Sequence, residues 1–421
     1  MSKLDDLIKK LCPNGVEYKT IGEIGSVIRG NGLQKKDFVD QGIGCIHYGQ
    51  IYTYYGLFTE TTKSFVEPEL AAHLCKVKPG NLVIACTSEN IEDVCKAVAW
   101  LGHDDIVTGG HACVFRHEQN AKYIAYIFQT EAFFTQKKKY ARGAKVIDIK
   151  AEDIAKISIP VPPLSVQEVI VRILDSFTKL EAELEAELEA RRRQYEYYRD
   201  KLLNFNELDK AKSGVKLMAL GEIIRSLKTG LNPRQNFKLN QDDCTLPYIT
   251  GKDIFDHRVN ASEKTAKINE TAVALINRRA AMENGDLLFA STGSGTVGRM
   301  AIVENYNNDW AISETLYAIK VKSDIVDVHY LLHSLNSSGA KEQYTQKISK
   351  GSVPHLKVVD LLQVKIPILP LPEQQKIANL LNKFERFVND LTCGLPSEIK
   401  VRRQQYEYYR DKLLTFSQLQ G

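Results

Sequence analysis

The stretch RRRQYEYYRDKLLNF, from Arg191 to Phe205, returns as RRQQYEYYRDKLLTF, from Arg402 to Phe416. Only two of the fifteen positions differ between these copies. The offset is 402 − 191 = 211 residues, half of the 421-residue chain. A match of this length does not arise by chance. The sequence therefore predicts a tandem duplication, and a function that needs two similar units at a fixed separation.

The duplication extends well beyond this stretch. IPVPPLSVQEVIVRILDSF from Ile159 aligns with IPILPLPEQQKIANLLNKF from Ile366, and GVEYKTIGEI from Gly15 aligns with GVKLMALGEI from Gly214. Each half thus has an opening segment, a variable block, a Pro-rich closing segment and a helix. The expected parts are a first variable domain with the N-terminal segment, a central helix, a second variable domain and a distal helix, at 1–158, 159–210, 211–365 and 366–421.

Composition is that of an ordinary globular protein, with 43% hydrophobic and 26% charged residues. The formal net charge of +4 is too small to identify a nucleic-acid partner by itself. The first residues, MSKLDDLIKKL, do not resemble a signal peptide, and no apolar run is long enough to span a bilayer. The eight cysteines form no CxxC pair and the histidines do not cluster. We therefore expect a cytoplasmic protein with buried thiols, no metal site and no membrane contact.

A long helix is expected after the first block. Ser165 with Glu168 has the form of a capping box, and no Gly or Pro follows until beyond residue 207. Such a helix is about 60 Å long and its narrow apolar stripe requires a partner helix. The duplicate supplies it, starting near Pro372 and broken near 393–396. We expect an α+β fold in which an antiparallel coiled coil of two long helices holds two pseudo-repeated mixed α/β domains apart.

The middle of the first helix reads LEAELEAELEARRR, a repeated four-residue unit that begins at Leu180. Its glutamates would repel DNA and are interpreted as a solvated coiled-coil face, supported by i,i+4 pairs with the arginines. Each additional unit lengthens a helix by about 6 Å. The repeat therefore suggests a spacer whose length sets a distance.

The sequence carries no convincing catalytic motif. Gly293 to Gly298 matches GxGxxG, but Arg299 to Val303 is typical of a strand, whereas a dinucleotide site needs a helix there. We expect a tight glycine turn between two strands, able to approach a phosphate backbone closely. GxxxxGK(S/T), HExxH, GxSxG and the Asn/Asp-Pro-Pro-Tyr/Phe tetrapeptide of adenine methyltransferases are absent. The two copies share no acid, base or nucleophile, so we expect a binding protein rather than an enzyme.

The first block contains two candidate DNA-contacting segments. CIHYGQIYTYYG, from Cys45 to Gly56, alternates polar and apolar residues, as in a strand with one exposed side or with aromatics in the core. His and Gln can read base edges and Tyr can contact phosphates. Five cations in the nine positions 137–145 favour phosphate contact over a merely solvated face. The candidates of this block are Arg29, Asn31, His47, Tyr48, Gln50, Tyr54, Lys137, Lys138, Lys139, Arg142 and Lys145.

The second block offers comparable elements in different residues. A cationic cluster around Gly351 occupies the position that the 137–145 cluster has in the first half. Equal placement with different residues fits two domains that grip the DNA backbone alike and read different bases. The candidates are Arg225, Lys228, Asn232, Arg234, Lys252, Thr292, Ser294, Arg299, Lys347, Lys350, Ser352, His355 and Lys357.

Over essentially its whole length the chain resembles the specificity subunit of type I restriction-modification enzymes. The resemblance rests on two variable blocks, two QYEYYRDKLL helices, GLPSEI at Gly394, the IPxPPL-type closing segment and the LEAE repeat. The second closing segment departs from the first, with Leu369 in place of Pro162.

The resemblance implies a non-catalytic subunit that binds an interrupted double-stranded DNA sequence. Each domain would read one half-site and the coiled coil would set the gap. Two modification subunits, using S-adenosylmethionine, would dock on the conserved helices, and restriction subunits, using ATP and Mg, would join them. No cofactor is expected in this chain. The partner-binding candidates are Tyr195, Tyr198, Arg199, Tyr406, Tyr409 and Arg410. An orphan specificity subunit without a restriction partner and a structural coiled-coil adaptor remain as alternatives.

Overall fold

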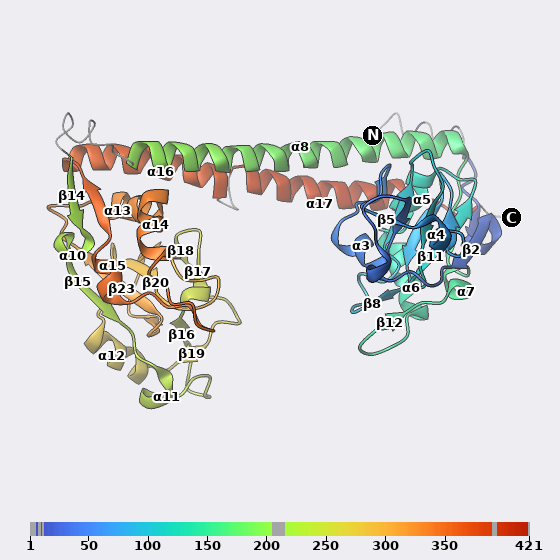
Figure 1. The fold of residues 1–421 in the computed structure, drawn as a ribbon. Helices are drawn as coiled ribbons and strands as arrows, with labels where there is room; N and C mark the ends of the chain where they lie inside the picture. The colour runs from blue at the N-terminus through green and yellow to red at the C-terminus, as the bar shows by residue number, and fades with distance from the viewer. Residues whose placement is uncertain (1–5, 7–9, 11, 204–214, 390–393, 420–421) are drawn as a thin grey trace. The chain divides into compact units, whose positions relative to one another are not determined.

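The computed structural model describes residues 6, 10, 12–203, 215–389 and 394–419 (Figure 1). The chain forms two compact units, one of residues 1–183 and 401–421 and the other of residues 184–400. Each unit contains one variable block together with part of the long helices. Among the described residues, no helix combines the length and the apolar character needed to cross a membrane.

A five-stranded sheet forms the centre of the first unit. Its order is β2 (Gly25–Arg29), β11 (Ala112–His117), β7 (Leu82–Ala85), β9 (Ala97–Trp100) and β4 (Phe58–Thr59). All neighbours are antiparallel except β4, which runs parallel to β9. β7 and β9 read LVIA and AVAW and are buried at every position. Continuous burial implies that both faces of this sheet are covered.

The two faces pack on different elements. Leu82 and Ile84 join a core with Tyr123 of α5 (Ala121–Ile127) and the first turns of the long helix. Val83 joins a core with Ile46 of the second sheet. That sheet has the order β5 (Ser64–Val66), β3 (Ile43–Ile46), β10 (Ile106–Thr108) and β6 (Cys75–Val77). The remaining elements are α2 (Ile21–Ile24), η1 (Lys35–Asp37), α3 (Tyr48–Thr53), α4 (Pro68–Ala71), β8 (Thr87–Ser88), α6 (Glu131–Tyr140), β12 (Ile147–Asp148) and α7 (Ala151–Ile154).

The second unit repeats this plan with different residues. An antiparallel sheet has the order β15 (Ile224–Thr229), β23 (Leu316–Val321), β20 (Leu287–Ala290) and β21 (Met300–Ile302). A three-stranded sheet has the order β19 (Lys267–Ile268), β16 (Leu246–Ile249) and β22 (Ala311–Ile312). A two-stranded sheet consists of β17 (Ile254–Phe255) and β18 (Arg258–Val259). The helices of this block are α10 (Leu220–Ile223), α11 (Pro233–Asn236), η2 (Gly251–Asp253), α12 (Glu270–Arg279), α13 (Val328–Asn336), α14 (Ser338–Thr345) and α15 (Val358–Leu362).

The glycine-rich segment connects two antiparallel strands. β20 pairs with β21, with Leu287 opposite Ile302, and Gly293, Gly295 and Gly298 all have positive φ between them. The predicted glycine turn is confirmed, and the helix that a dinucleotide site needs does not follow it.

The opening and closing segments of each block pair with one another. β1 (Tyr18–Thr20) runs antiparallel to β13 (Ser158–Pro160), and β14 (Lys216–Ala219) runs antiparallel to β24 (Lys365–Ile368). The chain therefore enters and leaves each block side by side, beside the long helices. This pairing explains why these segments repeat although the blocks between them diverge.

Helix α8 runs unbroken from Leu164 to Leu203, as the sequence predicts (Figure 1). Ser165 lies in its first turn, so the predicted N-cap is wrong. The amides of Val166 and Gln167 donate instead to the carbonyl oxygen of Pro163, at 2.9 and 3.1 Å. The predicted continuation to residue 207 lies outside the described residues.

The distal conserved helix is broken, as predicted. It consists of α16 (Leu371–Asn389) and α17 (Leu395–Leu413). Pro372 lies in the first turn of α16. Between the two helices Gly394 has a φ of +79°, and a Cβ there would collide with the carbonyl oxygen of Phe387. α17 begins at Leu395, within the segment 393–396 where the break was expected.

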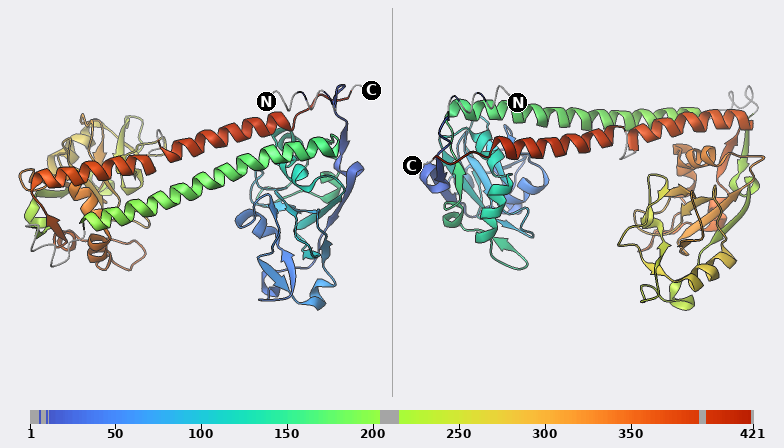
Figure 2. Two further views of the ribbon diagram at one scale, coloured as in Figure 1. Left: turned by 90° about the horizontal axis from the view of Figure 1, so that it is seen from above. Right: turned by 180° about the vertical axis from the view of Figure 1, so that it is seen from behind.

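Within the first unit, α17 packs antiparallel against the first half of α8 (Figure 2). The ring of Phe177 stacks on Tyr409 with centroids 5.6 Å apart, and Glu181 pairs with Arg403. Moving from Phe177 to Glu181 along α8, the contacted residue of α17 moves back from Tyr409 to Arg403, so the two helices run antiparallel. The predicted α+β class with paired long helices is confirmed.

The cysteines behave as packing residues. Those that the structure describes have free thiols, and all of them except the half-buried Cys75 are buried. Burial raises the pKa of the Cys45 and Cys95 thiols to about 12. Cys393 lies outside the described residues.

Candidate nucleic-acid interface

The cationic run of the first block divides into inward and outward residues. Lys138 and Lys139 are exposed in the last turn of α6. Lys137 is buried, and its Nζ donates to the carbonyl oxygens of Glu92 and Val94 at 2.9 and 2.6 Å. Burial lowers the pKa of its ammonium group. The prediction of a DNA contact is wrong for Lys137, because its donors satisfy interior carbonyls.

A closed loop, residues 142–148, follows α6. The Arg142 amide donates to the Asp148 carbonyl at 3.1 Å, and the Asp148 amide donates back at 2.8 Å. Gly143 has a φ of +114°, and a Cβ there would collide with the carbonyl oxygen of Val146. Arg142 and Lys145 are exposed on this loop. They remain DNA-contact candidates held on a well-defined turn.

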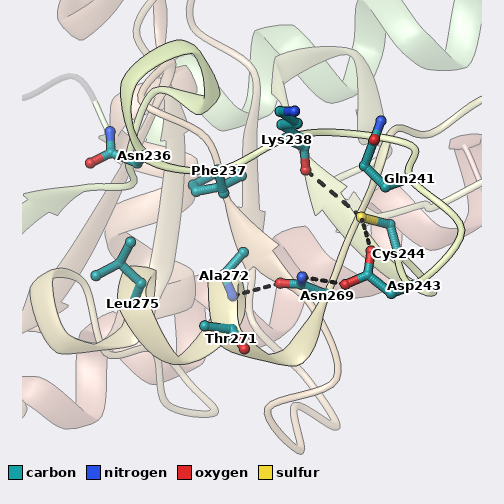
Figure 3. Close-up of a pocket in the computed structure, with 10 residues that line it drawn as sticks. All are labelled: Asn236, Phe237, Lys238, Gln241, Asp243, Cys244, Asn269, Thr271, Ala272 and Leu275. Carbon is teal, nitrogen blue, oxygen red and sulfur yellow. Dashed lines mark hydrogen bonds between the residues drawn. The ribbon is translucent and has the colours of Figure 1, made fainter.

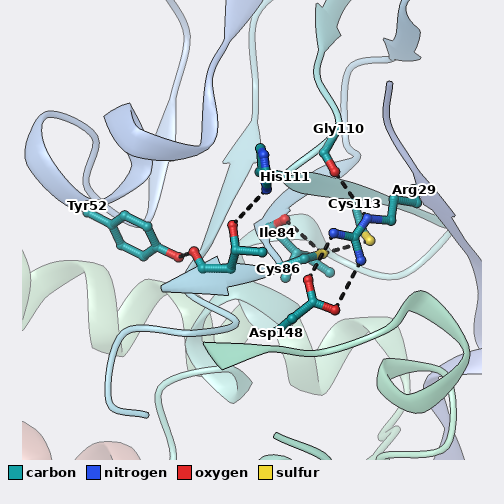
Figure 4. Close-up of polar contacts among 9 residues, drawn as sticks. Arg29, Tyr52, Ile84, Cys86, Gly110, His111, Cys113 and Asp148 are labelled. Atoms are coloured by element: carbon teal, nitrogen blue, oxygen red, sulfur yellow. Dashed lines mark hydrogen bonds and ion pairs between the residues drawn. The ribbon is translucent and has the colours of Figure 1, made fainter. Parts of the chain in front are cut away.

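Arg29 supports the base of this loop (Figure 4). Its Nη2 lies 2.9 Å from Oδ1 of Asp148, and its Nε donates to the carbonyl oxygen of Gly110 at 3.0 Å. The carboxylate raises the pKa of the Arg29 guanidinium, chiefly through the side-chain hydrogen bond. Part of its donor set is therefore already used within the protein, although the side chain is still partly exposed.

The segment from Cys45 to Gly56 is not one strand. β3 ends at Ile46, and the chain then turns into the short helix α3. His47 caps this helix, because its Nδ1 accepts from the Gly49 amide at 3.2 Å. Gln50 accepts from the His47 amide at 3.1 Å and donates to Ser64 Oγ at 2.6 Å. His47 and Gln50 are both buried, so the prediction that they read base edges is wrong for this conformation.

Three other candidates of the first block keep part of their surface. Tyr48 is half-buried, with its ring 4.9 Å from that of His111. Tyr54 is exposed, and Lys63 Nζ lies 4.5 Å from its ring centroid. Asn31 is exposed but donates to the carbonyl oxygen of His73 at 2.9 Å.

The second block carries a loop of the same kind, residues 349–355. The Ser349 amide donates to the His355 carbonyl at 3.0 Å, and His355 Nδ1 lies 2.7 Å from the hydroxyl oxygen of Thr292. Lys350 and Ser352 are exposed on the loop. Lys347, Lys357 and, in the glycine turn, Ser294 and Arg299 are exposed as well. The structure thus gathers the Thr292 and His355 candidates, far apart in sequence, at one place.

The remaining candidates of this block do not form a single cluster. Lys228 and Arg234 are exposed, whereas Asn232 is half-buried and donates to Glu314 at 3.0 Å. Arg225 stands at the opposite end of β15 from Asn232, and its Nε donates to the Val321 carbonyl at 2.8 Å. Strand geometry separates the two ends of β15 by well over 10 Å. Arg225 therefore lies apart from Asn232, and its DNA contact stays a prediction. Exposed Lys252 lies in η2.

The structure contains a polar hollow that the sequence did not predict (Figure 3). It has a volume of about 370 Å³ and lies between the segment from Asn236 to Cys244 and the start of α12. Asn269 caps α12 by accepting from the Ala272 amide at 2.9 Å, and it donates to Asp243 at 2.7 Å. No repeat or motif marks these residues, so the hollow could not be predicted from the sequence.

The conserved QYEYYRDKLL helices turn several partner-binding candidates inward. In the second unit the Tyr195 ring stacks on Phe384, with centroids 6.0 Å apart, and its hydroxyl lies 3.1 Å from His333 Nδ1. Arg199 is also buried and pairs with Asp200 at 3.0 Å. The prediction that Tyr195 and Arg199 contact a partner is wrong, because both belong to the interior of this unit.

The equivalent residues of the first unit also make contacts within that unit. Tyr406 donates to Gln129 at 3.3 Å, Tyr409 stacks on Phe177, and Arg410 pairs with Asp411 at 3.0 Å. Of the predicted residues, Tyr198 is exposed and stays a candidate, and the helices also expose Tyr197 and Tyr408. Tyr197 and Tyr408 are the same residue of the repeat. The helix phase decides which tyrosine faces outward, and the sequence alone did not resolve that phase.

No group of three or more possible His, Cys, Asp or Glu ligands gathers among the residues that the structure describes. The predicted DNA-contact residues that stay exposed are mainly cationic or polar, and most lie on loops and helix ends. This is the chemistry of phosphate and base-edge contacts.

Known proteins match the chain along most of its length. The family model for the type I restriction modification DNA specificity domain matches residues 13–190 and again residues 212–401. A type I restriction enzyme specificity subunit of Escherichia coli is 35% identical over 272 residues, which cover 62% of this chain and 63% of that protein. A putative type I restriction enzyme specificity subunit of Haemophilus influenzae is 32% identical, covering 66% of this chain and 69% of that protein.

A solved structure has a similar fold. The solved protein comes from work on complex assembly and conformational transition of the type I R-M system. It superimposes on the present chain with a TM-score of 0.64 at 16% identity. The alignment covers 96% of this chain and 98% of that one.

Proposed function

Because this chain belongs to the family of type I restriction-modification DNA specificity subunits, we propose that it recognises an interrupted DNA sequence, one half-site per unit. Members of this family are non-catalytic, and separate modification and restriction subunits carry the chemistry. The observation that carries the proposal is the duplication itself. Paired opening and closing strands repeat in the two units, while the exposed polar residues of the blocks differ.

Phosphate contacts would come from the exposed cations of each block. In the first unit these are Lys138, Lys139, Arg142 and Lys145, and in the second Lys347, Lys350 and Lys357 have the corresponding role. Such contacts supply affinity and orientation without sequence information. Base selection would then come from the differing polar residues, among them Tyr54, Ser294 and Arg299.

The LEAE repeat would set the gap between the half-sites. It lies within α8, which continues without a break from Leu164 to Leu203. A helix gains about 6 Å for every four residues, close to two base-pair steps of duplex DNA. A change in repeat number would therefore alter the gap and leave both half-sites unchanged.

Two copies of a modification subunit would dock on the repeated helices. The exposed Tyr197 and Tyr408 are equivalent positions, and tyrosine is enriched at the energetic centres of protein interfaces. These subunits would use S-adenosylmethionine to methylate adenines, and restriction subunits would use ATP and Mg. The assembly would act in the cytoplasm, where the DNA is.

Selection from a random duplex library tests this function directly. The full chain is incubated with the library, bound duplexes are amplified, and the enriched sequences are read. The proposal expects two short fixed half-sites separated by a gap of constant length. Exchanging residues 215–365 for the block of another family member should replace one half-site only. Enrichment of a single uninterrupted sequence, or of none, would overturn the proposal.

A further inference from the structure

The two closed loops occupy equivalent positions in the duplication. Aligning Ile159 with Ile366 gives an offset of 366 − 159 = 207 residues. The same offset places loop 142–148 on loop 349–355, and Val146 on Val353. The loops read RGAKVID and SKGSVPH, and valine is the only residue that they share at matched positions.

The backbone of both loops is closed and anchored in the same way. The first residue of each loop donates its amide to the carbonyl oxygen of the last, at 3.1 Å in loop 142–148 and 3.0 Å in loop 349–355. The following residues continue the match. Ile149 donates to the Cys86 carbonyl at 3.0 Å, and Leu356 donates to the Ser291 carbonyl at 2.8 Å. Two blocks with different sequences therefore close and anchor a loop at the same place, although the return bond differs: the Asp148 amide donates to the Arg142 carbonyl, whereas the His355 amide donates to Ser349 Oγ.

The shared valine is exposed on both loops. Val146 is 60% exposed and Val353 is 58% exposed. A single exposed valine on a protein surface is ordinary. Here the exposed valine is the one side chain that two diverged loops retain, and it contributes little to the interior of either unit. Its retention therefore points to a contact outside the chain.

The charge around these valines favours DNA over a protein as that contact. Apart from the buried Lys137, segment 136–150 contains four exposed lysines and one exposed arginine against a single acid, Asp148, which pairs with Arg29 at 2.9 Å. Segment 343–357 contains three lysines and no acid. An apolar tip among cations matches a groove of duplex DNA, whose phosphates line both edges and whose sugars and base edges offer apolar surface.

We propose that Val146 and Val353 are matched apolar contacts that enter a groove of the bound duplex, while the neighbouring cations hold its phosphates. The inference rests on the proposed function and adds a positioning contact to it. Since two units with different half-sites carry the same side chain, the valines contribute affinity and register rather than the choice of base.

The test compares Val146→Ser, Val353→Ser and the double variant with the wild-type full chain. The probe is a labelled duplex carrying the sequence that the wild-type chain enriches from a random library. Each substitution is expected to weaken binding about fivefold to tenfold (about 1–1.4 kcal/mol), with the two effects additive. Val→Ile at both positions should restore wild-type affinity, and the enriched half-sites should stay the same in every variant.

Val359→Ser is the matched control, because Val359 is 61% exposed and lies on α15 of the same block, away from the loop tip. It should leave binding unchanged. Wild-type affinity in the double variant, or an equal loss in the control, would overturn the inference. So would variants that bind DNA normally and lose a modification subunit instead. Failure of the wild-type chain to enrich any duplex would reject the proposed function itself.

Discussion

A buried glutamine joins each recognition block to its long helix. Gln167 is fully buried in α8 and makes three hydrogen bonds. Its Oε1 accepts from the Asn120 amide at 3.0 Å, and its Nε2 donates to Pro162 O and to Gln119 Oε1, both at 2.8 Å. Asn120 is also the N-cap of α5. One side chain therefore ties a domain helix, the closing segment and α8 together.

Gln374 does the same in the second unit, at the offset of 374 − 167 = 207 residues. It is fully buried, accepts from the Asp327 amide at 2.9 Å, and donates to Ile325 O and Leu369 O at 2.9 and 2.7 Å. Asp327 is the N-cap of α13. Since the duplication keeps this arrangement in both units, we infer that the buried glutamine fixes each variable block to its long helix.

Replacing Gln167 by leucine removes three hydrogen bonds and leaves their partners without a replacement. At about 1 kcal/mol for each bond, and more for each buried group left unsatisfied, the unit should lose about 3–5 kcal/mol. The assay is urea unfolding of the full chain, with hydrogen exchange of the α5 amides to locate the effect in the first unit. Gln374→Leu should act equally on α13.

Gln375→Leu is the control for Gln374→Leu, because Gln375 is exposed and follows Gln374 on α16. Its effect should stay within about 0.5 kcal/mol. If Gln374→Leu changed stability no more than Gln375→Leu, the buried hydrogen bonds would not be what stabilises this junction.

Three further predictions follow from the structure. Lys137→Met should destabilise the first unit by about 2–3 kcal/mol in urea unfolding, whereas Lys138→Ala should leave stability unchanged and lower the salt dependence of DNA binding by about one counterion. Burial lowers the pKa of His333 to about 4, below its unfolded value of about 6.5. Stability of the second unit should therefore be full above pH 6.5 and fall toward pH 4, by up to about 1.4 kcal/mol per pH unit, and His333→Gln should remove that dependence in urea titrations. Deleting residues 184–187 should shorten the recognised gap without altering either half-site, as read by library selection; a changed half-site would contradict the spacer.

The sequence predicted the features that depend on local or repeated signals. The duplication, the unbroken helix and the break at Gly394 could be predicted because identical stretches and the absence or presence of Gly and Pro are visible directly. The helix start was missed by two residues, since an N-cap at Ser165 predicts a first helical residue at position 166, whereas α8 begins at Leu164.

Side-chain direction was harder to predict. The alternation from Cys45 onward suggested a strand, but His47 caps a helix instead, because its ring nitrogen and the Gln50 side chain satisfy the first amides of α3. Lys137 turns inward, where its ammonium group donates to the carbonyl oxygens of Glu92 and Val94. Such partners lie more than forty positions away and leave no trace in the local pattern.

Methyladenine mapping of the host genome, with and without this gene, would reveal whether the chain selects an interrupted methylation site. We expect one methylated motif to disappear when the gene is removed, consisting of two short half-sites around a gap of fixed length, and to return when the gene is restored. Loss of a motif without a gap, or an unchanged methylome in cells where the chain binds an active adenine methyltransferase, would show that the chain does not recognise such a site.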